Sequence, residues 1–157
     1  MKIELITIGK KNETFIEKGI GQYISRIRHY NKFDITYINS VKFSNNLSSN
    51  EIIRKETDLL LKRINSNDYI VLLDERGKSY SSMEFAAKLK NLTMNRFKKI
   101  VFIIGGSYGV SDLILDRANE TLALSNMTFS HQMARLFFLE QIYRAYTIIN
   151  QHPYHNE

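Results

Sequence analysis

The stretch Ile-Ile-Gly-Gly-Ser-Tyr-Gly at residues 103–109 decides the fold, because it places a glycine turn directly after a short apolar strand. Glycines in such a turn let backbone amides approach a ligand closely. In open α/β sheets, ligands collect at the carboxyl ends of the strands. The turn lacks the G-x-G-x-x-G spacing of dinucleotide-binding proteins, and taken alone it is better explained as an ordinary glycine turn.

Outward from this turn, strand patterns alternate with amphipathic helix patterns. We expect strands at residues 2–8, 33–41, 69–73, 100–104 and 121–124, and helices at residues 13–28, 48–64, 81–92, 112–118 and 130–150, from apolar spacing and serine caps. The expected caps are Ser48, Ser81, Ser111 and either Ser130 or Thr128. A turn is expected at residues 74–78 and a loop around Asn45 and Asn46. The alternation predicts an α/β fold, a mostly parallel sheet flanked by helices, in a single domain over residues 1–157.

The composition restricts the classes of protein to which the chain can belong. It has 157 residues with no cysteine, a formal net charge of +6 and 43% hydrophobic residues. The absence of cysteine excludes disulfides, thiolate metal sites and a cysteine nucleophile, and it suits a reducing cytoplasm. No apolar run approaches the roughly 20 residues of a membrane span, and residues 1–4 do not resemble a signal peptide. The net positive charge favours nucleic acid as a partner. The alternative is that the chain is simply a soluble basic protein.

Several local motifs point to other chemistries and fail on spacing. Gly-Lys-Ser at residues 77–79 is similar to the end of a P-loop, but Leu72 stands where that motif requires glycine. No G-x-S-x-G element supports serine hydrolysis. Asp74 and Glu75 end a buried strand, where acids bind a ribose or an amino group, or simply cap a turn. His131, His152 and His155 are candidate metal ligands, but the lack of cysteine and of an H-E-x-x-H motif argues against a zinc site.

The final helix pattern, residues 130–150, has apolar side chains on more than one face. Exposed apolar surface marks interfaces, so we expect a homodimer; the alternative is a helix buried in the centre of its own domain. Arg135 and Arg144 are about two and a half turns apart, so one can face a ligand and the other an interface, unless both lie on a solvated charged face. A further basic set suits an RNA-facing surface or an ordinary solubilising one. Its members are Lys10, Lys11, Arg26, Arg28, Arg96, Lys98 and Lys99.

Six segments, taken together and in order, resemble one family. They are Leu72-Leu-Asp-x-x-Gly-Lys78, Ile-Ile-Gly-Gly-x-x-Gly109, Leu124-Ser-x-Met-Thr128, His131-Gln-x-x-Arg135, Glu140-Gln-x-Tyr-Arg-Ala145 and Pro153-Tyr-His155. Over essentially its whole length the chain is similar to the RlmH family, SPOUT-class methyltransferases that modify N3 of a pseudouridine in 23S rRNA. Each segment alone is weak, but the ordered set is specific.

The resemblance implies an α/β knot, in which the C-terminal segment threads through a loop to form a trefoil. It implies a homodimer and S-adenosylmethionine as the methyl donor. It also implies a target pseudouridine in helix 69 of 23S rRNA within the assembled ribosome, with no metal and no membrane involved. The residues that it implies for the donor pocket are Leu73, Gly105, Leu124, Ser125, Asn126, Met127, Thr128 and Phe129.

The same resemblance suggests how the chemistry is divided among side chains. The imide nitrogen must lose its proton, so a base or an anion-stabilising cation is required. We expect His155 to handle the proton and Tyr154 to position the base or stack on it. We expect Arg135 and Arg144 to stabilise charge or hold phosphates. Two other functions stay open: a non-catalytic ribosome- or RNA-binding module of the same fold, and a nucleotide-binding enzyme that acts on a small molecule.

Overall fold

The computed structural model describes residues 1–9, 12–40, 47–95 and 97–156. Its centre is a sheet of five strands, paired in parallel in the order β2-β1-β4-β3-β5. The strands are β1 (Lys2–Ile8), β2 (Lys32–Ile38), β3 (Tyr69–Ser79), β4 (Lys99–Ile104) and β5 (Glu120–Ala123). Each predicted strand is present. The expected strand end at Val41 and the loop at Asn45 and Asn46 lie outside the described residues.

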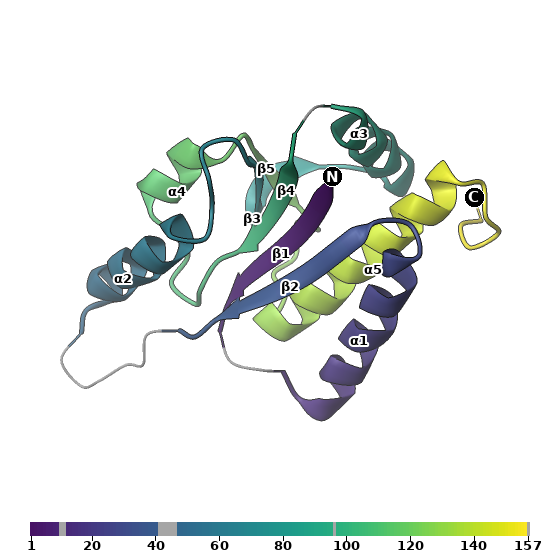
Figure 1. Ribbon diagram of the computed structural model, residues 1–157. Coiled ribbons are helices and arrows are strands. Elements are labelled where there is room, and N and C mark those ends of the chain that lie inside the picture. Colours follow the sequence, from purple (N-terminus) through teal and green to yellow (C-terminus); the bar gives the residue numbers. More distant parts are fainter. Residues whose placement is uncertain (10–11, 41–46, 96, 157) are drawn as a thin grey trace.

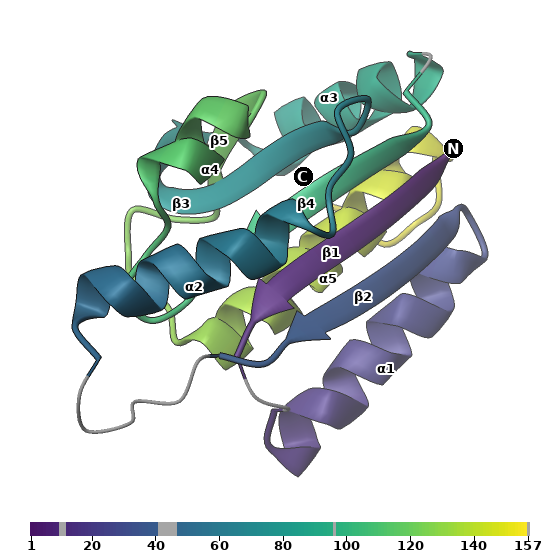
Figure 2. The same ribbon diagram turned by 60° about the vertical axis from the view of Figure 1, so that its left-hand side comes forward.

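Helices cover both faces of the sheet and give a three-layer arrangement. They are α1 (Thr14–Arg28), α2 (Ser49–Leu61), α3 (Ser82–Met94), α4 (Asp112–Arg117) and α5 (His131–Ile149). Figure 1 shows α1, α5 and α3 on one face, and Figure 2 shows α2 and α4 on the opposite face. The predicted helices are all present, although α2 ends at Leu61 rather than Ile64. Within the described ranges, no helix is both long and apolar enough to cross a membrane.

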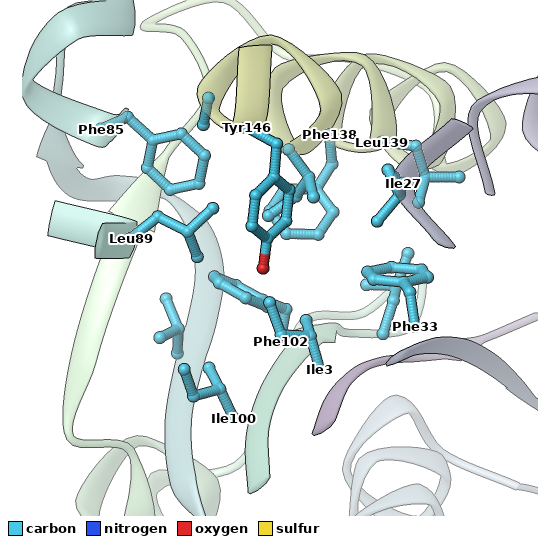
Figure 3. Packing of buried hydrophobic residues seen from close by; sticks show 14 of the residues in the cluster. Ile3, Ile27, Phe33, Phe85, Leu89, Ile100, Phe102, Phe138, Leu139 and Tyr146 are labelled. Carbon is cyan, nitrogen blue, oxygen red and sulfur yellow. The ribbon is translucent and has the colours of Figure 1, made fainter. Parts of the chain in front are cut away.

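The sheet separates two hydrophobic cores, which is why its central strands are apolar on both faces. Successive side chains of a strand point to opposite faces, so β4 contributes to each core in turn. Val101 and Ile103 pack with α2 and α4, whereas Phe102 packs with α5. Figure 3 shows the larger core, in which the ring centroids of Phe102 and Phe138 lie 4.7 Å apart.

The helix α5 lies between α1 and α3 and contacts both. Its inner face is buried against the sheet through Phe138, Leu139 and Ile142. On its outer face, Phe137 is 41% exposed. The helix is therefore central to its own layer and still presents apolar surface outward, as the apolar residues on more than one face predicted.

Residues 74–78 do not form the expected turn, which corrects the sequence prediction. Instead β3 continues through them and pairs with β5 on both sides of a bulge between Leu73 and Lys78. Gly77 permits this close pairing, because a Cβ there would lie 2.7 Å from the backbone nitrogen of Leu122. The bulged segment forms part of the pocket described below.

The helix starts follow the predicted caps with one exception. Ser48 and Ser81 each form the expected capping box, and the Ser130 hydroxyl caps α5. Ser111 makes no side-chain cap to α4, because its hydroxyl instead accepts a hydrogen bond of 2.8 Å from Thr57. That bond ties the start of α4 to α2 on the same face of the sheet.

Candidate functional site

A pocket of about 400 Å³ lies beside the bulge of β3 and at the carboxyl ends of β4 and β5, the edge of the sheet at which the sequence predicted a ligand. Three segments build it: residues 73–76 at the bulge of β3, the glycine turn after β4, and the loop between β5 and α5. The predicted donor-binding residues that line it are Leu73, Gly105, Leu124, Ser125, Met127, Thr128 and Phe129. Asn126, also predicted, is exposed in the same loop and is not part of the lining.

The glycine turn brings bare backbone to the pocket. A Cβ on Gly105 would lie 2.6 Å from Cγ1 of Val110, and a Cβ on Gly106 would collide with the buried carboxylate of Glu56. Gly109 has a φ of 86°, in the left-handed region that favours glycine. Its N–H donates to the Gly106 carbonyl at 3.0 Å and closes the turn. This wall therefore offers amides and carbonyls rather than side chains.

The lining also carries paired polar side chains. The Thr128 hydroxyl donates to Glu75 at 3.0 Å and ties the β5–α5 loop to the bulge of β3. Asp74 accepts two hydrogen bonds of 2.9 Å from the Arg76 guanidinium. These bonds hold the pKa of Asp74 below its usual range, so this carboxylate is ionised at neutral pH.

His131 begins α5 and lines the same pocket. Burial, and after it the charge of Arg135, lowers the pKa of His131 below its usual range, which favours a neutral imidazole at neutral pH. Among the residues that the structure describes, no group of three or more His, Asp or Glu side chains suits a metal ion.

Arg135 is buried, and it is not among the residues that line the pocket. Its guanidinium donates to the Thr7 hydroxyl at 2.8 Å and to the Ile8 carbonyl at 3.0 Å. It also donates to Asn12 at 2.7 Å and lies 5.4 Å from the ring centroid of Tyr37. The alternative of a solvated charged face is wrong for this residue, which joins the start of α5 to the ends of β1 and β2.

Three predicted catalytic residues, Arg144, Tyr154 and His155, come together beyond the pocket, near the far end of α5. Arg144 forms a salt bridge of 2.6 Å with Glu140, and its Nη1 lies 3.2 Å from Nδ1 of His155. The Tyr154 hydroxyl donates to the same Glu140 at 3.2 Å. The Arg144 guanidinium lies 4.9 Å from the Tyr154 ring centroid. We call these four residues the tail cluster.

The electrostatics of the tail cluster fix the protonation of two members. Burial and a hydrogen bond with Tyr23 raise the pKa of Tyr154 well above its ordinary value, so the phenol stays protonated and acts as a donor. The hydrogen bond to Glu140 raises the pKa of Arg144, which keeps the guanidinium cationic. The cluster therefore combines a cation, a phenol and an imidazole.

One of the basic residues predicted to face RNA adjoins the tail cluster. The guanidinium of Arg26 lies 5.7 Å from the ring centroid of Tyr23 and 5.4 Å from that of Tyr143. Arg28 and Lys99 instead form ion pairs with acids of β2 and β1. Lys10, Lys11 and Arg96 were also predicted to face RNA, and they lie outside the described residues.

The pocket and the tail cluster are separated along α5. His131 lines the pocket and Arg144 holds the tail, and the helix between them spans roughly 20 Å at about 1.5 Å per residue. In Figure 1 the helix runs from the loop after β5 to the yellow C-terminal turn near the end of α1. Within one chain, the two groups of predicted site residues therefore do not meet.

Comparison with known proteins identifies the architecture. A family model described as "Predicted SPOUT methyltransferase" matches residues 1–155. The chain belongs to the SPOUT methyltransferase family. Among its relatives, the "Ribosomal RNA large subunit methyltransferase H" of Parabacteroides distasonis is 46% identical over 157 residues, covering 100% of both chains. The protein of the same name from Christiangramia forsetii is 43% identical over 156 residues, covering 99% of each.

Membership of the SPOUT family implies the α/β knot as well as the parallel sheet. A solved structure of a probable methylase family protein from Haemophilus influenzae Rd KW20 matches with a TM-score of 0.55 and 12% sequence identity. The match covers 99% of this chain and 70% of that chain, and at this identity it supports the fold alone. The predicted fold class, a parallel sheet flanked by helices in a SPOUT knot, is thus confirmed.

Sequence reasoning assigned no role to several residues that adjoin the two sites. Glu56 lies behind the glycine turn, and nothing in the local sequence of α2 links it to that turn. Arg76 lines the pocket because of the unexpected bulge. Glu140 had a usable signal, since it precedes Arg144 by one helical turn and such pairs interact.

Proposed function

We propose that this protein transfers a methyl group from S-adenosylmethionine to N3 of a pseudouridine in helix 69 of 23S rRNA, acting in the cytoplasm on the assembled ribosome. The observation that carries the proposal is the pocket beside the β3 bulge and the carboxyl ends of β4 and β5, which is built by the segments that resemble the family. The names of the relatives support ribosomal RNA as the substrate. The net charge of +6 favours binding to an RNA backbone.

The pocket suits an adenosyl donor in size and chemistry. Its volume of about 400 Å³ lies within the roughly 300–1,000 Å³ of small-molecule sites. Leu73, Leu124 and Met127 would supply apolar walls, and the glycine turn would offer backbone groups to adenine and ribose. Asp74, Glu75 and Arg76 together leave this part of the lining with a net negative charge, which would attract a cationic ligand. When bound, S-adenosylmethionine supplies an electrophilic methyl group carried by a sulfonium.

The tail cluster would handle the RNA base. Tyr154 offers a ring on which a base can stack and a phenol that stays protonated. His155 would take the N3 proton, and the Arg144 cation would stabilise the resulting anion. Arg135 is enclosed by protein partners, so we assign it a positioning role at the start of α5. Alignment of the nitrogen with the methyl group would provide much of the rate enhancement.

These assignments require two copies of the chain, because one chain holds its pocket and its tail roughly 20 Å apart. A two-fold dimer that packs α5 against α5 in antiparallel fashion would bring each tail to the partner's pocket. The outer surface near the pocket suits such an interface, since Met127 is 74% exposed and Phe137 is 41% exposed. The ring centroids of Phe137 and Phe129 lie 5.0 Å apart. We therefore infer a homodimer with two composite sites.

The test is to incubate the purified protein with labelled S-adenosylmethionine and whole ribosomes, and to map the label on 23S rRNA by mass spectrometry. We expect one methyl group on a pseudouridine of helix 69. Calorimetry with S-adenosylmethionine is the companion measurement, because a non-catalytic RNA-binding module need not bind it. Absence of both binding and label would overturn the proposal. Activity on nucleotides without ribosomes would instead indicate a small-molecule enzyme.

A further inference from the structure

The chain turns sharply where α5 ends. The N–H of Gln151 donates to the Ile148 carbonyl at 3.1 Å, and the N–H of His152 donates to the Thr147 carbonyl at 2.8 Å. These two bonds form a Schellman motif. Gln151 occupies its left-handed position with a φ of 57°, where glycine is the usual residue. A non-glycine residue keeps this conformation when surrounding contacts fix it.

The holding contact comes from Tyr30, which follows α1. Its hydroxyl lies 2.7 Å from Nδ1 of His152, and the two rings are 5.7 Å apart. Tyr30 is itself fixed, because its ring is stacked on Tyr146 with a centroid distance of 5.5 Å and an interplanar angle of 2°. Tyr146 is buried and accepts a hydrogen bond of 2.8 Å from Asn31. His152, at the start of the C-terminal tail (residues 151–156), is thus attached through Tyr30 to Tyr146 of the core.

This attachment determines where the following residues begin. The N–H of Tyr154 donates to the His152 carbonyl at 2.8 Å, which makes a tight turn around Pro153. From there the Tyr154 hydroxyl reaches Glu140. A displacement of His152 would therefore be transmitted directly to Tyr154 and to the residue after it.

We propose that the contact between the Tyr30 hydroxyl and His152, which we call the pin, fixes the position of the C-terminal tail. Tyr154 and His155 are thereby held in one arrangement. Tyr30 and His152 are positioning residues, since neither is part of the tail cluster itself. The inference rests on the proposed function for the catalytic use of the tail. The pin itself rests only on the contacts described here.

The deciding measurement for the pin is amide hydrogen exchange of residues 151–156 in the purified protein, with residues 135–145 of α5 as the internal reference. Tyr30→Phe keeps the stacked ring and removes only the hydroxyl, and His152→Ala removes the other half of the contact. A hydrogen bond of ordinary net strength corresponds to roughly a fivefold change in population. We expect each variant to exchange about fivefold faster in the tail and at the wild-type rate in α5.

Two further variants separate the pin from general loosening. His152→Gln places an amide oxygen within reach of the phenol and should restore slow exchange. The double variant Tyr30→Phe with His152→Ala should exchange no faster than either single variant, because both changes remove the same bond. Wild-type exchange in both single variants, or additive effects in the double variant, would overturn the pin.

Methyl transfer to ribosomes distinguishes failure of the pin from failure of the proposed function. With the donor saturating, we expect Tyr30→Phe and His152→Ala to lower kcat about fivefold and to leave the Kd for S-adenosylmethionine unchanged, with rescue by His152→Gln. Faster tail exchange without any change in kcat would confirm the contact and overturn its role in presenting the tail. Absence of methyl transfer by the wild-type protein would overturn the proposed function while the exchange data still decide the pin.

Discussion

The pocket and the tail cluster differ in the groups that they expose, because the pocket includes bare backbone and the tail cluster consists of side chains. One wall of the pocket is bare backbone, supplied by the glycine turn after β4. The tail cluster consists of side chains that hold one another through Glu140. A wall of backbone is fixed by the whole sheet, whereas a cluster on a terminal segment depends on a few contacts. Substitutions at the two ends should therefore disturb separate steps, donor binding at one and base handling at the other.

The largest effect is expected in the tail cluster. His155→Ala removes the group assigned to the proton, and general acid–base catalysis contributes about 10²–10⁴-fold. We expect kcat on ribosomes to fall at least about 100-fold, while calorimetry shows unaltered binding of S-adenosylmethionine. Arg144→Lys is the matched variant, because it keeps the charge and loses the planar fork, and it should show an intermediate loss. Normal turnover by His155→Ala would remove the tail from the mechanism.

A mixing experiment tests whether the pocket of one chain works together with the tail cluster of the other chain in a dimer. Gly105→Ala chains and His155→Ala chains are each expected to be impaired alone. Random pairing makes half of the dimers mixed, and each mixed dimer holds one intact composite site, so about a quarter of wild-type turnover should return. If each chain used its own tail, the mixture would stay as impaired as its components.

The next effect concerns the backbone wall. A Cβ on Gly105 would lie 2.6 Å from Val110, and overpacking of this kind costs about 1–3 kcal/mol. We expect Gly105→Ala to weaken S-adenosylmethionine binding by about tenfold or more, measured by calorimetry. Gly21→Ala is the control, because nothing lies within 4 Å of a Cβ at that helical position. Equal binding by both variants would show that bare backbone is not needed.

A smaller effect is expected at the turn after α5. Gln151→Gly relieves a left-handed residue, a conformation that costs other residues roughly 1–2 kcal/mol. We expect its free energy of unfolding in urea to rise by about 1 kcal/mol at most, and that of Gln151→Val to fall. A loss of stability in the glycine variant would contradict the left-handed turn.

The smallest effect is a pH dependence of stability at the pocket. The pKa of His131 is lowered in the folded state, chiefly by burial, so the unfolded chain binds the proton more readily. Its contribution to stability is complete above the ordinary pKa of 6.5 and is lost as the pH falls through the lower folded value. Urea unfolding should show a falling free energy as the solution is acidified through this window. His131→Gln should flatten that slope, and an identical slope in both proteins would remove His131 as its source.

The secondary structure was predictable because most of its signals are local. Ser48 and Ser81 lie three residues before a glutamate, and both form capping boxes. The bulge of β3 was not predictable in this way. Residues 74–78 have the composition of a turn, and only their pairing with β5, which lies far along the chain, keeps them in the strand.

The pocket was easier to predict than the arrangement of the arginines. The glycine turn and residues 124–129 are contiguous in sequence, so a resemblance to a family carries their position over together. Arg135 and Arg144 lie on the same helix, and their spacing does not reveal what surrounds each of them. Arg135 is enclosed by Thr7 and Asn12, from the opposite end of the chain, which no pattern around residue 135 indicates.

The place of α5 in the sequence has a consequence for biosynthesis. It follows all five strands in chain order, yet its Phe138, Leu139 and Tyr146 are part of the larger core (Figure 3). During translation, the apolar sheet face between α1 and α3 therefore stays exposed to solvent until the residues of α5 have left the ribosome. Nascent chains with such exposed apolar surface are prone to aggregation and are substrates for chaperones. We expect the yield of folded protein to depend on how long translation pauses before α5.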